Sequence, residues 1–177
     1  LSLLTDKVLK SALFESNIAQ FHFEKIDLVE ITKQVIQSMK LVVDKSNAVI
    51  ELEHTGEDFE LNGERDQLIN VLFNLLDNSL KYGRAPITIK VEIKAQPKTV
   101  SIVVSDNGIG IPKSHQQKVF EKFYRVPTGD IHNTKGHGLG LSYVDSVVKG
   151  HIGSIEIQSE EGQGCTFTVT LKRTHET

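Results

Sequence analysis

The chain has 177 residues, of which 38% are hydrophobic and 24% are charged, and its formal net charge is −3. These values are typical of a globular protein with one sizeable core, and the slightly acidic balance argues against a nucleic-acid partner, because nucleic-acid binders usually carry a basic excess. The single cysteine excludes an intramolecular disulfide and fits a reducing compartment, and no apolar stretch approaches the roughly 20 residues that cross a bilayer. We therefore expect a cytoplasmic location, which leaves open a longer parent protein anchored in a membrane.

The first 26 residues predict a junction to a preceding domain. Residues 1–16 carry apolar side chains at close to helical spacing and predict the end of a helix. Residues 17–26 alternate apolar and polar side chains, which is typical of a short strand or an extended linker. Because the chain begins at Leu1 and not at Met, we expect a fragment of a longer protein. The main domain is expected over residues 27–173, followed by a tail at 174–177.

The sequence of the main domain predicts helices and strands in alternation. Asp27 has the position of a helix N-cap, with Glu30 at capping-box spacing, and the helix is expected to run to about Ser46. The remaining elements are expected as a strand at 48–52, a helix at 64–82 that ends before Gly83, strands at 87–93 and 99–104, a short helix near 113–120, a helix at 138–150, and strands at 152–157 and 166–171.

The connections between these strands indicate the fold class. Two of the expected strand pairs are joined by short turns, at residues 96–98 and 160–164, and such pairs must be antiparallel. The order of elements therefore predicts an α+β two-layer sandwich, with a mixed, mostly antiparallel sheet and helices on one face. The stretch from 105 to 137 holds little regular structure, and a loop longer than ~15 residues inside a compact domain is usually functional.

The helix expected at 64–82 carries a polar stripe. At about 100° per residue, the stripe consists of Asn70, Asn74, Asp77, Asn78 and Lys81. A solvated face is the simplest interpretation, but the central part of the helix contains no Glu, Lys or Arg, and asparagine is a poor helix former. Amide oxygens one turn apart can face one hard cation, and an ammonium group one turn further can meet a phosphate. We therefore predict a ligand-binding role for Asn74 and Asn78 with Lys81, and a surface position for Asn70.

The segment Asp106–Ile111 follows an apolar strand and contains two glycines. A carboxylate at the end of a strand can accept a hydrogen bond from an exocyclic amine such as that of adenine, and Gly108 and Gly110 permit positive φ and the close approach of a flat ligand. Asp-Asn-Gly is also a common turn sequence, so the segment alone leaves both interpretations open. It is not the dinucleotide-binding fingerprint, because Gly-x-Gly-x-x-Gly is absent.

A second glycine cluster opens the helix expected at 138–150. Gly136, Gly138 and Gly140 alternate with other residues, which is more glycine than a flexible helix start requires. Backbone amides at a helix N-terminus bind phosphate oxygens, so this cluster predicts phosphate binding. It is not a Walker A loop, because no Gly-Lys-Ser/Thr follows.

Other reactive residues give weaker signals. Arg125 follows the aromatic segment Phe120–Phe123, and an arginine there can stabilise charge on a transferring phosphoryl group, although a surface arginine is an equal alternative on spacing alone. The seven histidines are scattered along the chain and predict no metal site. Cys165 lies beside an expected strand and is interpreted as a small buried residue, not as a nucleophile.

These segments, in this order, resemble the conserved boxes of the catalytic and ATP-binding domain of sensor histidine kinases. That family shares its Bergerat-type fold with the gyrase, Hsp90 and MutL ATPases (the GHKL superfamily), and the resemblance covers about residues 27–173. The matching segments are Asn74–Tyr82 (the asparagine box), Asp106–Ile111 (the first glycine box), Phe120–Phe123 (the phenylalanine box) and Gly136–Leu141 (the second glycine box).

The resemblance implies a site for ATP and magnesium. Asn74 would bind the metal, Asn78 and Lys81 would approach the phosphates, Tyr82 would lie near adenine, and Asp106 would accept its amine. Residues 126–137 would form a mobile ATP lid. The full set of implied ATP contacts is Asn74, Asn78, Lys81, Tyr82, Asp106, Gly108, Gly110, Lys122, Arg125, Gly136, His137, Gly138, Leu139, Gly140 and Thr166, the last as an assistant to Asp106. Ser79 stands where alanine is usual and His137 where threonine is commoner.

The function implied is that of a two-component sensor histidine kinase, which transfers the γ-phosphoryl group of ATP to a histidine. That histidine is expected on an upstream helical hairpin, because no histidine precedes Phe21 in this chain. The expected partners are this dimerisation and phosphoacceptor domain and a response regulator; the fragment is expected to be a monomer and its parent a homodimer.

Two alternatives remain. A nucleotide-binding regulatory module without transferase activity, such as a degenerate kinase or an anti-sigma-like binder, is disfavoured by the intact Asn74, Asp106 and glycine cluster. An ATPase of the gyrase and Hsp90 type is disfavoured by the phenylalanine box and the short length.

Overall fold

The structure is a computed structural model that describes residues 21–127 and 138–174. The helix expected at 1–16, the first linker residues and most of the expected lid lie outside the described residues, as do Gly136 and His137.

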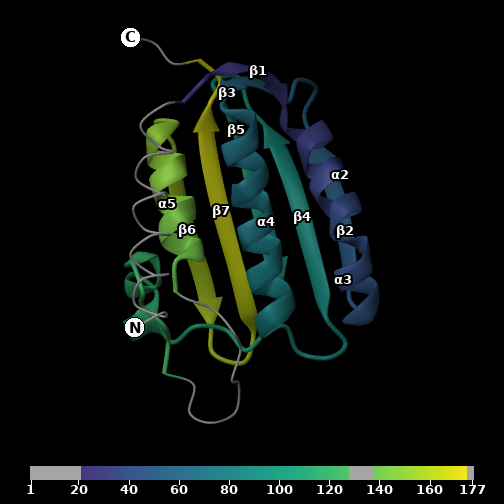
Figure 1. Cartoon of the computed structure of the whole chain (residues 1–177), viewed down its shortest axis with the longest axis vertical. Coiled ribbons are helices and arrows are strands. Elements are labelled where there is room, and N and C mark those ends of the chain that lie inside the picture. Colours follow the sequence, from purple (N-terminus) through teal and green to yellow (C-terminus); the bar gives the residue numbers. More distant parts are fainter. Residues whose placement is uncertain (1–20, 128–137, 175–177) are drawn as a thin grey trace, which may run out of the picture.

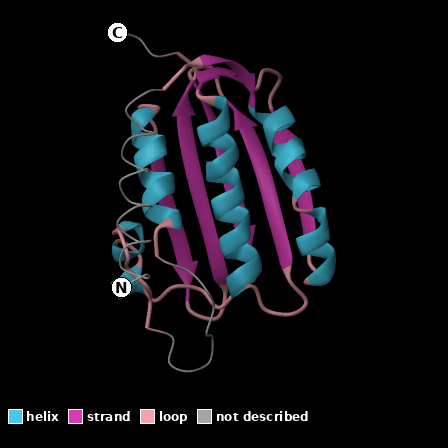
Figure 2. Cartoon of the chain, in the orientation of Figure 1, coloured by secondary structure: helices cyan, strands magenta, loops and turns pink. Residues whose placement is uncertain are grey.

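In the described part of the chain, five strands form one sheet and the helices lie on one face of it (Figures 1 and 2). The strands follow the spatial order β2 (Val49–Thr55), β4 (Thr88–Ala95), β5 (Thr99–Asp106), β7 (Gly164–Lys172) and β6 (Ser154–Glu160). All neighbours pair antiparallel except β2 and β4, which are parallel. The helices are α2 (Leu28–Ser38), α3 (Lys40–Lys45), α4 (Arg65–Tyr82) and α5 (Gly140–Gly150). The predicted α+β sandwich with a mixed, mostly antiparallel sheet is therefore confirmed.

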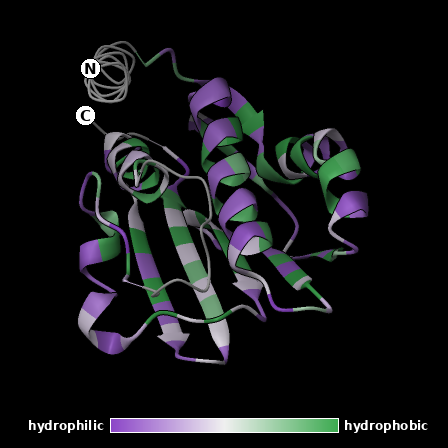
Figure 3. Cartoon of the chain, turned by 60° about the horizontal axis from the view of Figure 1, so that its bottom comes forward, coloured by the Kyte–Doolittle hydropathy of each residue, from purple (hydrophilic) through white to green (hydrophobic). Residues whose placement is uncertain are grey.

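The core lies between the sheet and the helices. Alternate residues of the central strands are buried on the helix-covered face, so hydrophobic and hydrophilic residues alternate along the strands (Figure 3). Helix α4 lies in front of the middle of the sheet and buries its apolar side, including Leu68, Leu72, Leu75 and Leu76, all with 0% exposure. Full burial of one leucine contributes roughly 1.5–3 kcal/mol, so this helix is held by packing while its polar stripe stays accessible.

The predicted start of the first helix is confirmed in detail. The Asp27 carboxylate accepts hydrogen bonds from the backbone N–H groups of Val29 (2.8 Å) and Glu30 (3.1 Å), as an N-cap residue does. The helix predicted to reach Ser46 is interrupted at Met39, between α2 and α3. The Ser38 hydroxyl donates to the Val35 carbonyl at 2.7 Å, and such back-bonding bends helices.

Two short elements differ from the prediction. Residues 24–27 form strand β1 (Glu24–Asp27), which pairs with β3 (Glu60–Gly63) in a separate two-stranded sheet, and β3 was not predicted. The short helix expected near 113–120 is two 3₁₀ turns, η1 (Lys113–His115) and η2 (Lys118–Phe120). Each turn has three residues, and both belong to the loop that follows β5, which the structure describes as far as residue 127.

Candidate nucleotide-binding site

A cavity of about 390 Å³ opens beside helix α4, toward the end of strand β5. Its walls come from α4, the loop after β5, residues 124–126, the start of α5, and strand β7. The predicted ligand residues that line it are Asn74, Asn78, Lys81, Tyr82, Asp106, Gly110, Arg125, Gly138, Leu139 and Gly140. The fold thus brings together segments that lie up to some 90 positions apart in the sequence, as the order of the motifs predicted.

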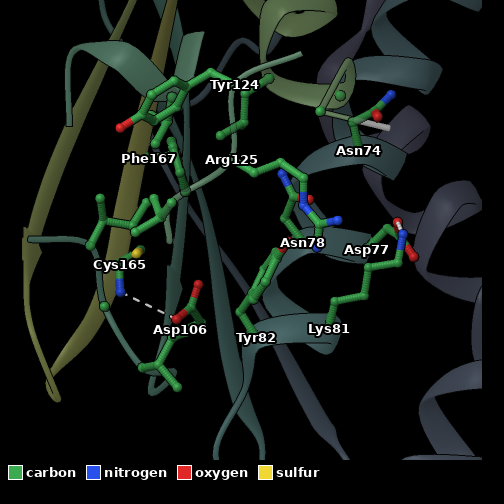
Figure 4. A pocket seen from close by; sticks show the side chains of 18 of the residues that line it. Asn74, Asp77, Asn78, Lys81, Tyr82, Asp106, Tyr124, Arg125, Cys165 and Phe167 are labelled. Carbon is green, nitrogen blue, oxygen red and sulfur yellow. Dashed lines mark hydrogen bonds and ion pairs between the residues drawn. The ribbon is translucent and has the colours of Figure 1, made fainter. Parts of the chain in front are cut away.

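The cavity has two chemically different ends (Figure 4). Asp106 and Cys165 lie at one end, and Phe167, two residues after Cys165 on β7, adds apolar wall on the same side. The other end is polar and contains Asn74, Asn78, Asp77, Lys81 and Arg125. Tyr82 lies between Asp106 and Lys81 in the close view. A flat, largely apolar group with one donor fits the first end, and an anionic group fits the second.

The orientation of the Asn74 amide is fixed by its own helix. Its Nδ2 donates to the backbone carbonyl of Asn70 at 2.8 Å, so its Oδ1 atom is the one left for a ligand. Helix α5 begins directly beside this oxygen: a Cβ atom at Gly140 would lie 2.8 Å from Asn74 Oδ1. A side chain at position 140 would therefore displace the Asn74 amide oxygen from its place beside the start of α5.

Lys81 is held in place by its neighbour on the stripe. Its Nζ atom lies 2.5 Å from Oδ2 of Asp77, one helical turn earlier. Side-chain exposures of 38% for the lysine and 29% for the aspartate keep both groups in contact with solvent and with the cavity. An exposed pair at this spacing is worth only a few tenths of a kcal/mol, so an anionic ligand can draw the ammonium group away from Asp77.

Three hydrogen bonds hold the Asp106 side chain in place. Its Oδ1 atom accepts hydrogen bonds from the backbone N–H groups of Gly108 (2.9 Å) and Cys165 (3.2 Å), and its Oδ2 atom accepts one from the Ser79 hydroxyl (3.0 Å). Burial raises the pKa of Asp106 above its ordinary value, and these three hydrogen bonds oppose that rise because they favour the charged form.

The loop after Asp106 is clamped between α4 and the β6–β7 turn. The Ile109 N–H donates to the Tyr82 carbonyl at 3.0 Å, and the Gly162 N–H donates to the Ile109 carbonyl at 2.7 Å. Gly110 has φ +72°, and a Cβ atom there would lie 2.0 Å from the Glu160 carbonyl oxygen. Gly110 is thus needed for the backbone to pass the β6–β7 turn. From the sequence, the only close approach expected at this glycine was that of a ligand. Gly108 is buried and contributes its N–H to Asp106 without lining the cavity.

Two predicted contacts lie elsewhere. Lys122 is exposed and is not among the cavity-lining residues. Thr166 lies on the opposite face of β7 from Phe167, and its hydroxyl pairs with the Ser105 hydroxyl at 3.0 Å. The contacts that Thr166 was expected to make with Asp106 come instead from the Cys165 N–H and the Ser79 hydroxyl, because side chains alternate between the two faces of a strand.

Ser79 was noted in the sequence only as a departure from the usual alanine. It is 1% exposed and lies on the apolar side of α4, between Leu76 and Leu80. A polar residue on a buried helix face needs a hydrogen-bond partner, and that was the signal in the sequence that could have singled it out.

Comparison with known proteins agrees with this geometry. The sequence model for the family described as "Histidine kinase-, DNA gyrase B-, and HSP90-like ATPase" matches residues 63–175, more than half of the chain. The chain belongs to this family. Among the relatives of this ATPase domain, Sensor protein RprX of Bacteroides fragilis is 34% identical over 94% of the chain, and Sensor histidine kinase WalK of Bacillus subtilis is 32% identical over 95%. The chain spans 32% and 28% of these two proteins, so it corresponds to about a third of their length.

The fold is also similar to solved catalytic domains of histidine kinases. The catalytic domain of histidine kinase ThkA superposes with a TM-score of 0.77 at 26% identity, covering 88% of the chain and all of that domain. The predicted resemblance to the ATP-binding catalytic domain of a sensor histidine kinase is therefore confirmed.

None of the helices in residues 21–127 and 138–174 is long and apolar enough to cross a membrane. The same residues contain no group of three or more His, Cys, Asp and Glu side chains arranged to hold a metal ion.

Proposed function

We propose that this domain binds ATP in the cavity beside α4 and transfers its γ-phosphoryl group to a histidine on a separate helical domain of a longer parent protein. The observation that carries the proposal is the division of one cavity into an apolar end with a half-buried acceptor, Asp106, and a polar end with Lys81 and Arg125. An adenine nucleotide has the same two ends, a flat base with an amine and a chain of anionic phosphates.

At the polar end, several groups favour negative charge. Lys81 and Arg125 are cations that line the cavity, and the backbone of Gly138, Leu139 and Gly140 leads into the N-terminus of α5. The N-terminus of a helix favours phosphate through its free amides and its dipole. In this proposal Asn78 and Lys81 contact the phosphates, and Arg125 stabilises charge on the transferring phosphoryl group, as phosphoryl transfer generally requires.

Magnesium fits the same end. The Asn74 Oδ1 atom faces the start of α5, because Nδ2 is engaged by Asn70, and oxygen ligands of this kind suit a cation that keeps several waters and shares phosphate oxygens. Bound magnesium would supply charge neutralisation at the phosphates. We propose Asn74 as its protein ligand, with Asn78 in reach one turn further along α4.

The partners follow from the class of relatives. The matching curated proteins are sensor kinases roughly three times the length of this chain, which supports an upstream phosphoacceptor and dimerisation domain in the parent, itself a homodimer. The ThkA kinase has been solved in complex with the response regulator protein TrrA, and a response regulator is the corresponding partner proposed here. In this proposal the domain acts in the cytoplasm.

Phosphoryl transfer to an added acceptor tests the proposal. The purified domain is incubated with γ-labelled ATP, alone and with a separately produced hairpin that carries the phosphoacceptor histidine of the parent. We expect acid-labile label on the hairpin and none on the domain, because catalysis requires an acceptor nitrogen held close to the γ-phosphate. The Asp106→Asn variant should lose most of this label, and Asp44→Asn, the same change at an exposed position of α3, should keep it.

The same experiment separates the alternatives. Binding of ATP without labelling of the hairpin would contradict the transferase proposal and favour a regulatory module. Steady release of inorganic phosphate in the absence of any acceptor would instead favour an ATPase of the gyrase and Hsp90 type.

A further inference from the structure

The carboxylate of Asp106 has one acceptor position left for a ligand. A carboxylate offers about four lone-pair sites. Two sites on Oδ1 are engaged by the backbone N–H groups of Gly108 and Cys165, and one site on Oδ2 is engaged by the Ser79 hydroxyl. Because Asp106 also lines the cavity, the remaining site of Oδ2 is the one available to a bound molecule.

We propose that Ser79 is a positioning residue for recognition of the nucleotide base: its hydroxyl fixes Oδ2 of Asp106 so that the carboxylate receives a ring amine in one orientation. This proposal rests on the proposed function, in which Asp106 meets the base of ATP. Ser79 itself does not line the cavity, so it acts through the carboxylate and not by touching the ligand.

The Ser79 hydroxyl is buried and donates its hydrogen bond to Asp106. The side chain is 1% exposed and is surrounded on α4 by the buried leucines at 76 and 80. An ionised carboxylate only accepts hydrogen bonds, so the hydroxyl must be the donor in the 3.0 Å contact. Alanine at this position would remove the donor and leave Oδ2 without the hydrogen bond that residues 21–127 and 138–174 supply to it.

The ionisation state of Asp106 supports the same role. Burial raises the pKa of Asp106, and the Ser79 hydrogen bond is one of three contacts that lower it. The charged form only accepts hydrogen bonds, whereas a proton on Oδ2 would add an O–H donor that competes with the ligand amine for the same position. Ser79 therefore favours the form of Asp106 that accepts an exocyclic amine, and that form disfavours a base with a carbonyl at the same ring position.

A ligand-based comparison tests this role. The affinities of ADP and of purine riboside diphosphate, which lacks the exocyclic amine, are measured by calorimetry for the wild type and for Ser79→Ala. In the wild type, loss of the amine should weaken binding about 10-fold or more, the range for a hydrogen bond to a charged group. In Ser79→Ala, ADP should bind about 3- to 10-fold more weakly and the analogue nearly as before, so the ratio between the two ligands shrinks.

Two control variants are measured with the same two ligands. Thr32→Val removes another fully buried hydroxyl, one that donates to the Leu28 carbonyl on α2 at 2.7 Å and lies far from the cavity. Ser79→Thr keeps a hydroxyl at the same position. Both should keep the wild-type ratio between ADP and the analogue, and thermal melts report whether each variant folds.

The possible outcomes are distinct. Equal weakening of both ligands in Ser79→Ala would assign Ser79 a purely structural role and overturn the proposal, as would unchanged binding of ADP. A wild-type domain that binds ADP and the analogue equally well would show that Asp106 does not receive the amine, which overturns this inference while nucleotide binding stands. A wild-type domain that binds neither ligand would contradict the proposed function itself.

Discussion

At the scale of single residues, the charge of Asp106 destabilises the fold, although the proposed binding of the base depends on it. Burial raises its pKa in the folded protein above the ordinary carboxyl value, so the folded state holds a proton more tightly than the unfolded state. The free energy of unfolding then falls as the pH rises from the ordinary carboxyl pKa through the raised value. At neutral pH the charged carboxylate is therefore destabilising, a trade-off common at functional sites.

The substitution Asp106→Asn should expose this trade-off. An asparagine can keep its oxygen on the Gly108 and Cys165 N–H groups and turn its amide toward the Ser79 hydroxyl, which leaves the fold intact. Without nucleotide at pH 7, the variant should melt at a higher temperature than the wild type, because the substitution removes a charge that burial disfavours. The difference should shrink as the pH is lowered toward the ordinary carboxyl pKa. A lower melting temperature for the variant at pH 7 would contradict the assignment of Asp106 as a destabilising charge.

The sequence predicted most of the side chains that line the site but not how they are held. Asn74, Lys81 and Asp106 were identified because each stands in a local pattern of helix spacing or strand end. The partners of Asp106 were not identified, because the Cys165 N–H comes from 59 positions away and a backbone donor has no signature in the sequence. The role of Thr166 beside Asp106 was implied only by the family resemblance. In the structure its hydroxyl pairs with Ser105, because it lies on the other face of β7, and the sequence alone did not provide the strand register that decides the face.

At the scale of elements, the polar stripe of α4 contains two asparagines one helical turn apart whose surroundings differ. Asn70 and Asn74 lie on the same side of the helix, but Asn70 is exposed and only Asn74 lines the cavity beside Gly140. The position along the helix, and not the residue type, should therefore decide which asparagine binds the metal.

Alanine substitutions at these two asparagines test this difference. Each replaces a poor helix former by a good one, so neither should destabilise α4 through backbone propensity. Calorimetry of ATP with and without magnesium should show that Asn74→Ala loses most of the gain in affinity that magnesium gives, whereas Asn70→Ala retains it. A magnesium effect of wild-type size in Asn74→Ala would remove Asn74 as the metal ligand.

Elements with a strong periodic pattern were predicted well, and the exceptions have physical causes. Helix α4 and the two hairpins carry long apolar patterns and clear end signals such as Gly83. Strand β3 has four residues, and Leu61 is its one large apolar side chain, so the sequence shows no run of alternating apolar residues there. The break at Met39 coincides with a hydrogen bond from the Ser38 hydroxyl to the Val35 carbonyl, a local contact that the apolar pattern of the helix does not reveal.

At the scale of the whole molecule, hairpins predict antiparallel neighbours but not the order of strands across a sheet. The parallel pairing of β2 with β4 arises because the chain passes through β3 and α4 between them, a connection that short turns cannot reveal. This crossover places α4 over the middle of the sheet, next to α5 (Figure 1). The cavity lies along α4, so the arrangement of the layers brings Asp106 of β5, Cys165 of β7 and the stripe of α4 to one place.

The central claim is that this cavity binds an adenine nucleotide with its base on Asp106. The most direct test is calorimetric titration of the whole chain with ADP, comparing the wild type with Asp106→Asn and with the matched exposed control Asp44→Asn. In Asp106→Asn the amide would present a donor to the donor amine of the base, so affinity should fall at least about 10-fold, while Asp44→Asn should bind as the wild type does. Equal affinities for all three proteins would contradict the account.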